Sequence, residues 1–84
     1  KYVGEYELNR FNNQITIGKH NGNLYFQAPD NPKVVISPET ESTFYGTADE
    51  LGEIQVTFAL DTKRNVKYFV LRVGFLSLQF DKTN

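Results

Sequence analysis

Side chains able to act as nucleophiles or as soft metal ligands are scarce in this sequence. It has no cysteine and one histidine, His20, which precedes an Asn-Gly pair. Its serines occur in neither a G-x-S-x-G nor an S-x-x-K pattern, the arrangements that place an activated serine. We therefore predict no catalytic residue and no enzyme activity for the chain itself. We interpret His20 as a solvent-exposed turn residue, because a base or a metal ligand would need partners.

Carboxylates gather in one short segment, Asp49–Glu53, and oxygen ligands of this kind can hold calcium. The loop of a calcium-binding hand, however, spreads its ligands over about twelve residues, and this segment is too short. In the polar segment Asp61–Asn65, Lys63 stands where a ligand oxygen would be needed. A single histidine without cysteine also argues against zinc. We expect both segments to be solvated loops, and we predict neither a metal nor a cofactor.

A basic cluster of Lys63, Arg64 and Lys67 lies near aromatic residues, as on barrels that bind single-stranded nucleic acid. The whole chain, however, has nine Lys and Arg against ten Asp and Glu, a net charge of −1. Nucleic-acid-binding domains usually carry an excess of clustered basic charge. We predict no nucleic-acid partner, and we interpret the cluster as the solvated rim of a hairpin.

Three tyrosines, Tyr25, Tyr45 and Tyr68, are the strongest candidates for a binding face. Each is adjacent to an apolar residue that should point inward, so strict alternation turns the tyrosine outward. Outward tyrosines can bind a partner surface or stack on a sugar. They can equally pair across strands and support a sheet. The sequence leaves both interpretations open.

The elements that must position these side chains are predicted to be strands. Short apolar runs, several of them alternating with polar residues, are separated by turn residues, and no long segment has helical periodicity. The predicted strands cover residues 2–8, 15–17, 24–28, 33–37, 42–46, 54–60 and 66–80, the last broken at Gly74 by a tight turn or a bulge.

The predicted turns rest on particular residue types. The clearest is His20-Asn21-Gly22-Asn23, because Asn-Gly accepts the positive φ angles of a type I′ hairpin turn. Further turns are predicted at Asn12-Asn13, at 29–32 with its two prolines, and at Asp61–Asn65. Residues 48–53 are the one place where we expect a helical turn.

Seven to eight short strands with short links indicate an all-β fold, an antiparallel up-and-down barrel, with a two-sheet sandwich as the alternative closure. The interior should be packed by aromatic and aliphatic side chains, which leaves no deep lipid pocket. The predicted inward set is Tyr6, Ile15, Ile17, Leu24, Phe26, Phe44, Ile54, Val56, Phe58, Leu60, Phe69, Leu71, Leu76, Leu78 and Phe80.

Residues 1–84 are long enough for one domain. The chain starts without methionine, and it has neither an apolar signal segment nor a run of ~18 apolar residues that could span a bilayer. We expect either a domain excised from a longer protein or a mature secreted chain.

The order of several short motifs resembles a known family. The motifs are Tyr2-Val3-Gly4-Glu5-Tyr6, Gly22-Asn23-Leu24-Tyr25-Phe26-Gln27, Ile36-Ser37-Pro38-Glu39, Ser42-Thr43-Phe44-Tyr45, the Ile54–Phe58 strand, and Asp61 with Val66. Together they are similar to the small lipocalin-like β-barrel domain of unknown function found C-terminal to bacterial penicillin-binding-protein-like serine hydrolases and in Bacteroidetes envelope proteins. Asn65 departs from the usual turn glycine, and Val73-Gly74-Phe75 is more apolar than a final turn should be.

This resemblance implies a periplasmic or extracellular accessory domain and assigns no site residues. We expect a non-catalytic module that associates with a neighbouring catalytic domain or another protein, or that shapes access to an active site. The alternative is an independent binding module for a small apolar ligand or a glycan, which the aromatic content motivates.

Overall fold

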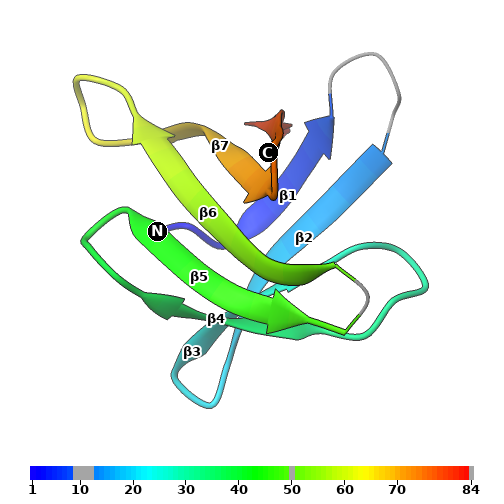
Figure 1. Cartoon of the computed structure of the whole chain (residues 1–84). Coiled ribbons are helices and arrows are strands. Elements are labelled where there is room, and N and C mark those ends of the chain that lie inside the picture. The colour runs from blue at the N-terminus through cyan, green and yellow to red at the C-terminus, as the bar shows by residue number, and fades with distance from the viewer. Residues whose placement is uncertain (9–12, 50, 84) are drawn as a thin grey trace.

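In the computed structural model the chain forms a closed barrel of eight antiparallel strands (Figure 1). The structure describes residues 1–8, 13–49 and 51–83. The strands are β1 (Gly4–Leu8), β2 (Asn13–His20), β3 (Asn23–Gln27), β4 (Val34–Pro38), β5 (Thr43–Ala48), β6 (Gly52–Leu60), β7 (Val66–Val73) and β8 (Leu76–Lys82). In the described part of the chain no helix is long and apolar enough to cross a membrane.

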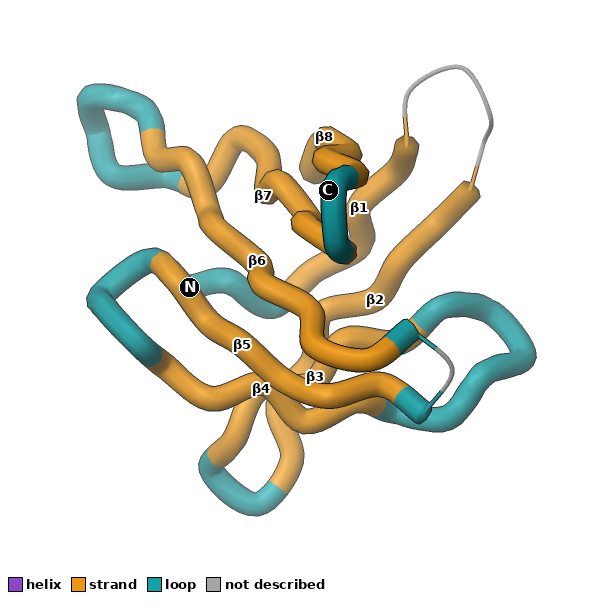
Figure 2. The backbone as a smooth tube through the Cα atoms, viewed as in Figure 1, coloured by secondary structure: helices purple, strands orange, loops and turns teal. Residues whose placement is uncertain are grey.

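Each strand pairs with the next one along the chain, and β8 returns to pair with β1 (Figure 2). The closing β1–β8 ladder is short and runs from the Tyr6–Lys82 pair to the Leu8–Phe80 pair. Beyond it, the N–H and the hydroxyl of Thr83 both donate to the Glu5 carbonyl, at 2.9 and 3.1 Å. These contacts close the sheet on itself. The predicted up-and-down barrel is therefore confirmed, and the two-sheet sandwich is not adopted.

The strongest turn predictions are also confirmed. Asn21 and Gly22 link β2 to β3 with φ angles of 53° and 84°, the two positive values that a type I′ turn requires. Gly74, with a φ of 58°, begins the short link between β7 and β8, so the break in the last apolar stretch is a tight turn. Of the Asn12-Asn13 prediction, Asn12 lies outside the described residues and Asn13 begins β2.

The helical turn predicted within residues 48–53 is wrong. Ala48 and Gly52 pair directly as the last rung of the β5–β6 ladder, after Thr47 and Glu53. Ala48, Gly52 and Glu53 therefore belong to strands rather than to a helical turn. Gly52 has a φ of 76°, a value that glycine adopts without steric cost.

The interior is filled by the chain's own side chains. Phe69 is fully buried at the centre, and its ring centroid lies 4.8 Å from that of Tyr6, 5.7 Å from that of Phe58 and 5.0 Å from that of Phe80. Among the described residues, the buried hydrophobic set is Tyr6, Ile15, Ile17, Phe26, Ile36, Phe44, Ile54, Val56, Phe58, Phe69, Leu71 and Phe80. The prediction of a packed aromatic interior agrees with this set.

Two positions depart from the predicted core. Ile36 is buried although the sequence prediction omitted it, because the run Val34-Val35-Ile36 has no alternation that would identify the inward residue. Leu76 is 58% exposed although it was predicted to be buried. It pairs with Val73 in the first rung after the β7–β8 turn, so it lies at the rim of the barrel. Leu24 and Leu78 are partly buried against the core, and Leu60 is half-buried.

The chain direction defines two ends of the barrel. The first, called here the Tyr2 end, has the N-terminal segment and the loops 39–42 and 61–65. The N-terminal segment lies beside the 39–42 loop (Figure 1). The opposite end, called here the Phe75 end, has the β3–β4 loop and the turns around Leu51 and Phe75.

Aromatic packing covers the Tyr2 end. Tyr2 was expected in the first strand, but β1 begins at Gly4 and Tyr2 lies across the barrel mouth instead. Its ring stacks on Phe58 at 4.2 Å and meets the Phe44 ring edge-on at 5.6 Å. Its hydroxyl donates to the Glu41 carbonyl at 2.8 Å. The N-terminal segment thus acts as a cap on this mouth.

The N-terminal cap also supplies a hydrogen-bond acceptor to Tyr6, the one fully buried tyrosine. The Tyr6 hydroxyl donates to the Tyr2 carbonyl at 2.8 Å, so this buried polar group has a partner. Burial disfavours the charged phenolate and raises the pKa of Tyr6 to about 12, with a smaller contribution from the neighbouring Tyr2 phenol.

Candidate binding groove

The three tyrosines predicted as a binding face lie on alternate strands. Tyr25 is on β3, Tyr45 on β5 and Tyr68 on β7, so no two of them are neighbours in a ladder. Tyr45 is 52% exposed, whereas Tyr25 and Tyr68 are half-buried. The barrel therefore gives each tyrosine different surroundings.

Tyr25 covers a glycine on the neighbouring strand. It pairs with Gly18 of β2, and a Cβ atom built on Gly18 would collide with the Tyr25 ring. The Lys33 ammonium lies 4.7 Å from the centre of the same ring, a cation–π distance. These contacts give Tyr25 a supporting role in the barrel wall.

Tyr68 lies near the irregular end of the β6–β7 ladder. It is paired with Ala59 on one side and Asp81 on the other, next to the register shift between Ala59 and Leu60. Its half-buried ring is on β7, between the neighbouring strands β6 and β8. The position suits cross-strand packing better than recognition of a ligand.

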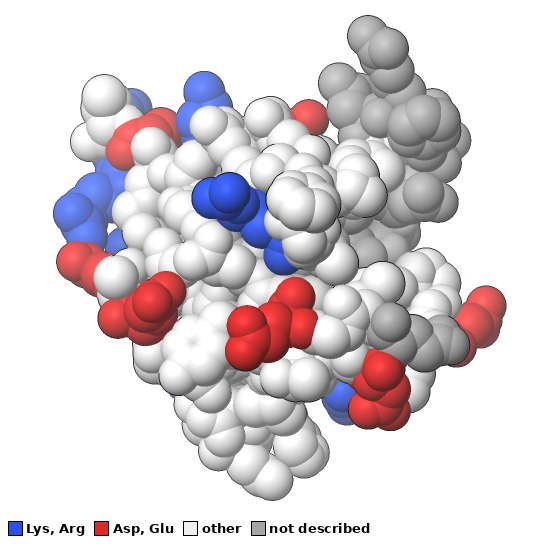
Figure 3. Space-filling view, viewed as in Figure 1, with Lys and Arg blue, Asp and Glu red and all other residues white. Residues whose placement is uncertain are grey.

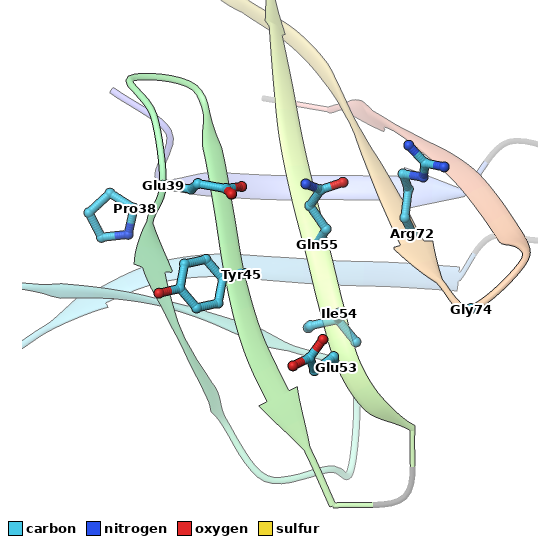
Figure 4. A pocket seen from close by; sticks show the side chains of 8 residues that line it. All are labelled: Pro38, Glu39, Tyr45, Glu53, Ile54, Gln55, Arg72 and Gly74. Carbon is cyan, nitrogen blue, oxygen red and sulfur yellow. The ribbon is translucent and has the colours of Figure 1, made fainter.

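Tyr45 lies at the centre of a surface groove of about 680 Å³ (Figure 4). It belongs to a cross-strand row in which Ser37, Tyr45, Gln55 and Arg72 are register partners on β4, β5, β6 and β7. The groove is lined by Pro38, Glu39, Tyr45, Glu53, Ile54, Gln55, Arg72 and Gly74. Because these strands are adjacent and extended, the row presents side chains about 4.8 Å apart along the outer wall.

The polar groups of this groove are not engaged by the protein. Within residues 1–8, 13–49 and 51–83, the side chains of Tyr45, Gln55 and Arg72 form no hydrogen bond or ion pair. The same holds in this part of the chain for the Glu39 and Glu53 carboxylates. These donors and acceptors face solvent and are available to a ligand.

A second groove, of about 360 Å³, lies on the outer wall of β1, β2 and β3. Three of its polar side chains, those of Glu5, Thr16 and Gln27, form hydrogen bonds within the protein. The Thr16 hydroxyl lies 3.0 Å from both carboxylate oxygens of Glu5, and the Gln27 amide donates to the Asn31 carbonyl at 2.9 Å. The comparison makes the Tyr45 groove the better candidate site.

The charge of the Tyr45 groove is mixed. Among the described residues that line it, Arg72 is the one basic residue, and Glu39 and Glu53 are the two acidic ones. Acidic and basic side chains are likewise interspersed on the face that shows β5 and β6 (Figure 3). The groove therefore suits a ligand that can exchange several hydrogen bonds without a large charge of its own.

Sequence reasoning identified Tyr45 but missed Gln55 and Arg72. Alternation alone places both on the outer wall, because Gln55 lies between the buried Ile54 and Val56, and Arg72 follows the buried Leu71. Alternation along one strand does not give the register between β5, β6 and β7. Only that register shows that the three side chains form one row.

Of the other chemical candidates, Glu53 of the acidic segment lines the groove, whereas His20 and the basic cluster are not among its lining residues. His20 is exposed at the end of β2, as predicted. In the described part of the chain, no three His, Asp or Glu side chains are grouped so that they could hold a metal ion. In the basic cluster, Arg64 forms an exposed ion pair with Glu41 at 2.7 Å, which joins loops 61–65 and 39–42.

The fold and its surface define a small closed antiparallel barrel with a filled interior and a polar groove on its outer wall. The chain belongs to the family described as a domain of unknown function, DUF3471, whose model matches residues 1–84. This agrees with the domain of unknown function indicated by the motif order. Searches of curated proteins and of solved structures found no match.

Proposed function

We propose that this domain is a non-catalytic accessory module of a bacterial hydrolase-type protein in the periplasm or outside the cell. In that role it associates with the catalytic domain and shapes access to the active site. The motif order supports the context, because it resembles the lipocalin-like barrels that follow penicillin-binding-protein-like serine hydrolases. The Phe75 end of the barrel supports the role.

The single observation that carries the proposal is the exposure of Phe75. Its relative exposure is 110%, so the ring has essentially no contact with the rest of the barrel. Leu76 and Leu51 at the same end are exposed by 58% and 55%. Apolar side chains gathered at an exposed tip are typical of protein-contact sites.

The partner favoured by this chemistry is an apolar depression on a neighbouring catalytic domain. A phenylalanine at the tip of a two-stranded hairpin can enter such a depression as a rigid anchor, with Leu76 beside it. Buried aromatic anchors of this kind supply much of the binding free energy at interfaces. Docking at this end would leave the Tyr2 cap, at the opposite end of the barrel, uncovered.

A thiol-labelling experiment tests the proposal, because the chain has no cysteine of its own. The variant Phe75→Cys is labelled with a maleimide in the isolated domain and in the full-length protein that carries it, and labelling is read at this peptide by mass spectrometry. Docking should slow labelling in the full-length protein at least about tenfold, which corresponds to about 1.4 kcal/mol.

The matched control is Lys63→Cys in the loop at the Tyr2 end, which should be labelled equally fast in both proteins. Equal labelling of Phe75→Cys in both would contradict docking at the Phe75 end. Deletion of the domain should alter the substrate range or stability of the catalytic domain, and an unaltered parent would count against the accessory role.

A second candidate function is the binding of a small ligand, and the Tyr45 groove favours it. The groove argues for a polar ligand such as a glycan. A small apolar ligand is less well supported, because the twelve core side chains fill the barrel and the groove is mostly polar.

A further inference from the structure

We infer that the Tyr45 groove is a binding site for a neutral saccharide, with Tyr45 as the stacking platform and with Gln55 and Arg72 as hydrogen-bonding groups. This inference rests on the second candidate function and does not depend on docking at the Phe75 end. It is argued from the exposed Tyr45 ring, from the cross-strand row that contains Gln55 and Arg72, and from the charge of the groove.

Tyr45 has the exposure that a sugar platform needs. A pyranose presents one apolar face of C–H groups, which packs on the negative face of an aromatic ring. Tyr45 is 52% exposed in the outer wall, and no aromatic ring of the described residues stacks on it. With only two rotatable side-chain torsions, a tyrosine loses little conformational entropy when it binds a ligand.

Gln55 and Arg72 lie in line with Tyr45 on the next two strands, β6 and β7. They are partners in one rung of the β6–β7 ladder, and Gln55 is also the β5–β6 partner of Tyr45. Two strand spacings of about 4.8 Å place the Arg72 backbone about 10 Å from that of Tyr45. A sugar stacked on the ring would therefore direct its hydroxyls toward the Gln55 amide, and a second sugar unit would reach Arg72.

The chemistry of these side chains matches hydroxyl groups. An amide offers both a donor and an acceptor, and a guanidinium offers five donors in a plane. Carboxylates such as those of Glu39 and Glu53 accept only, and each can take hydrogen bonds from two adjacent hydroxyls. Pairs of hydroxyls on neighbouring ring carbons are both donors and acceptors, so they can use all of these groups.

The balance of charge favours a neutral ligand. Glu39 and Glu53 outnumber Arg72 among the lining residues, so an anionic sugar would meet a net negative groove. The described lining residues also include no cluster of basic side chains for a phosphate-bearing ligand. Its volume of about 680 Å³ falls within the range of about 300–1,000 Å³ that is usual for small-molecule sites.

An NMR titration tests the site. The ¹⁵N-labelled chain is titrated with neutral oligosaccharides of glucose, mannose, galactose and N-acetylglucosamine, and in separate arms with uronic acid and glucosamine oligomers. At least one neutral oligosaccharide should shift amide signals of β5, β6 and β7, with a dissociation constant in the millimolar range that is typical of an open groove. Signals of β1 and β2 should not move.

Variants show whether the named side chains carry the binding. Tyr45→Ala should raise the dissociation constant about tenfold through loss of the platform, and Tyr45→Phe should retain most of the affinity. Gln55→Ala and Arg72→Ala should each weaken binding severalfold. Gln27→Ala in the second groove is the matched control and should have no effect. Retained dispersion of the amide spectrum shows that each variant is folded.

The inference is overturned by any of three results. The first is that no neutral oligosaccharide shifts the β5–β7 signals at about 20 mM, well above a millimolar dissociation constant. The second is a clear preference for the uronic acid or the glucosamine oligomers. The third is a titration that Phe75→Ser abolishes and Tyr45→Ala leaves unchanged, which would place the ligand at the Phe75 end.

Discussion

The two ends of the barrel use aromatic residues in opposite ways. At the Tyr2 end, the Tyr2 ring stacks on Phe58, and its hydroxyl and carbonyl form hydrogen bonds with the Glu41 carbonyl and the Tyr6 hydroxyl. At the Phe75 end, Phe75 is fully exposed, and Leu76 next to it is more than half exposed. Both ends carry large apolar side chains, yet only one end buries them.

This difference separates the residues that stabilise the fold from the residues that are available to contact a partner. At the Tyr2 end, the rings of Tyr2, Phe44 and Phe58 pack on one another, so the loss of one of them should destabilise the barrel. Side chains at the Phe75 end are already in water, so their loss should leave the folded state nearly unchanged. The comparison predicts that the same substitution has a large effect at one end and almost none at the other.

Phe58→Ala should have the largest effect. Phe58 is 3% exposed and its ring contacts those of Tyr2, Phe44 and Phe69. Truncation of a buried phenylalanine costs about 3–5 kcal/mol, which is a large share of the stability of a small domain. Urea unfolding followed by tyrosine fluorescence measures the loss. A loss below about 1 kcal/mol would mean that the Tyr2 end is not packed as described.

Alkaline pH should weaken the Tyr2 end through Tyr6. The folded state raises the pKa of Tyr6 from 10.0 to about 12, so it holds this proton more firmly than the unfolded chain does. The contribution is fully present below pH 10 and is lost as the pH rises through about 12. Two pKa units correspond to at most about 3 kcal/mol.

Tyr6→Phe isolates this contribution from the titration of other groups. The variant loses the hydrogen bond to the Tyr2 carbonyl, at a cost of about 1 kcal/mol at neutral pH. Its unfolding free energy should then fall less steeply than that of the parent chain between pH 10 and pH 12. Identical slopes for the two proteins would show that Tyr6 is not held in its neutral form by burial.

Arg64→Gln should have a small effect, although Arg64 lies at the Tyr2 end. Its ion pair with Glu41 is 2.7 Å long, but the two side chains are 64% and 78% exposed. Solvent screens such a pair, and its contribution is about 0–1 kcal/mol. The thermal midpoint should move slightly at low salt and hardly at all at high salt. A loss comparable to that of Phe58→Ala would show that the loops, rather than the rings, stabilise this end.

Phe75→Ala should have the smallest effect on stability. The ring makes no contact that folding creates, so the free energy of unfolding should change by no more than about 0.5 kcal/mol. This is the matched partner of Phe58→Ala, with the same substitution at the other end. Urea unfolding measures both. A destabilisation of several kcal/mol would show that the Phe75 ring is packed in solution and would remove the basis for docking at this end.

Local sequence determined the strands and turns of this protein. Ile54, Val56 and Phe58 alternate with polar residues, and this period of two predicts a strand with one buried face. Asn21-Gly22 and Gly74 stand where the backbone adopts positive φ, which is a property of these residue types. Such features depend on neighbours in the chain, so they can be read without knowing the fold.

Only the tertiary structure decided what depends on register and on the ends of the barrel. Ile36 is buried and Leu76 exposed because one lies within the wall and the other at its rim, although both are aliphatic. Tyr45, Gln55 and Arg72 form one row because β5, β6 and β7 pair at a particular register. Alternation orients a side chain outward but does not say which side chain of the next strand lies beside it. That is why the sequence pointed to Tyr45 but not to the groove around it.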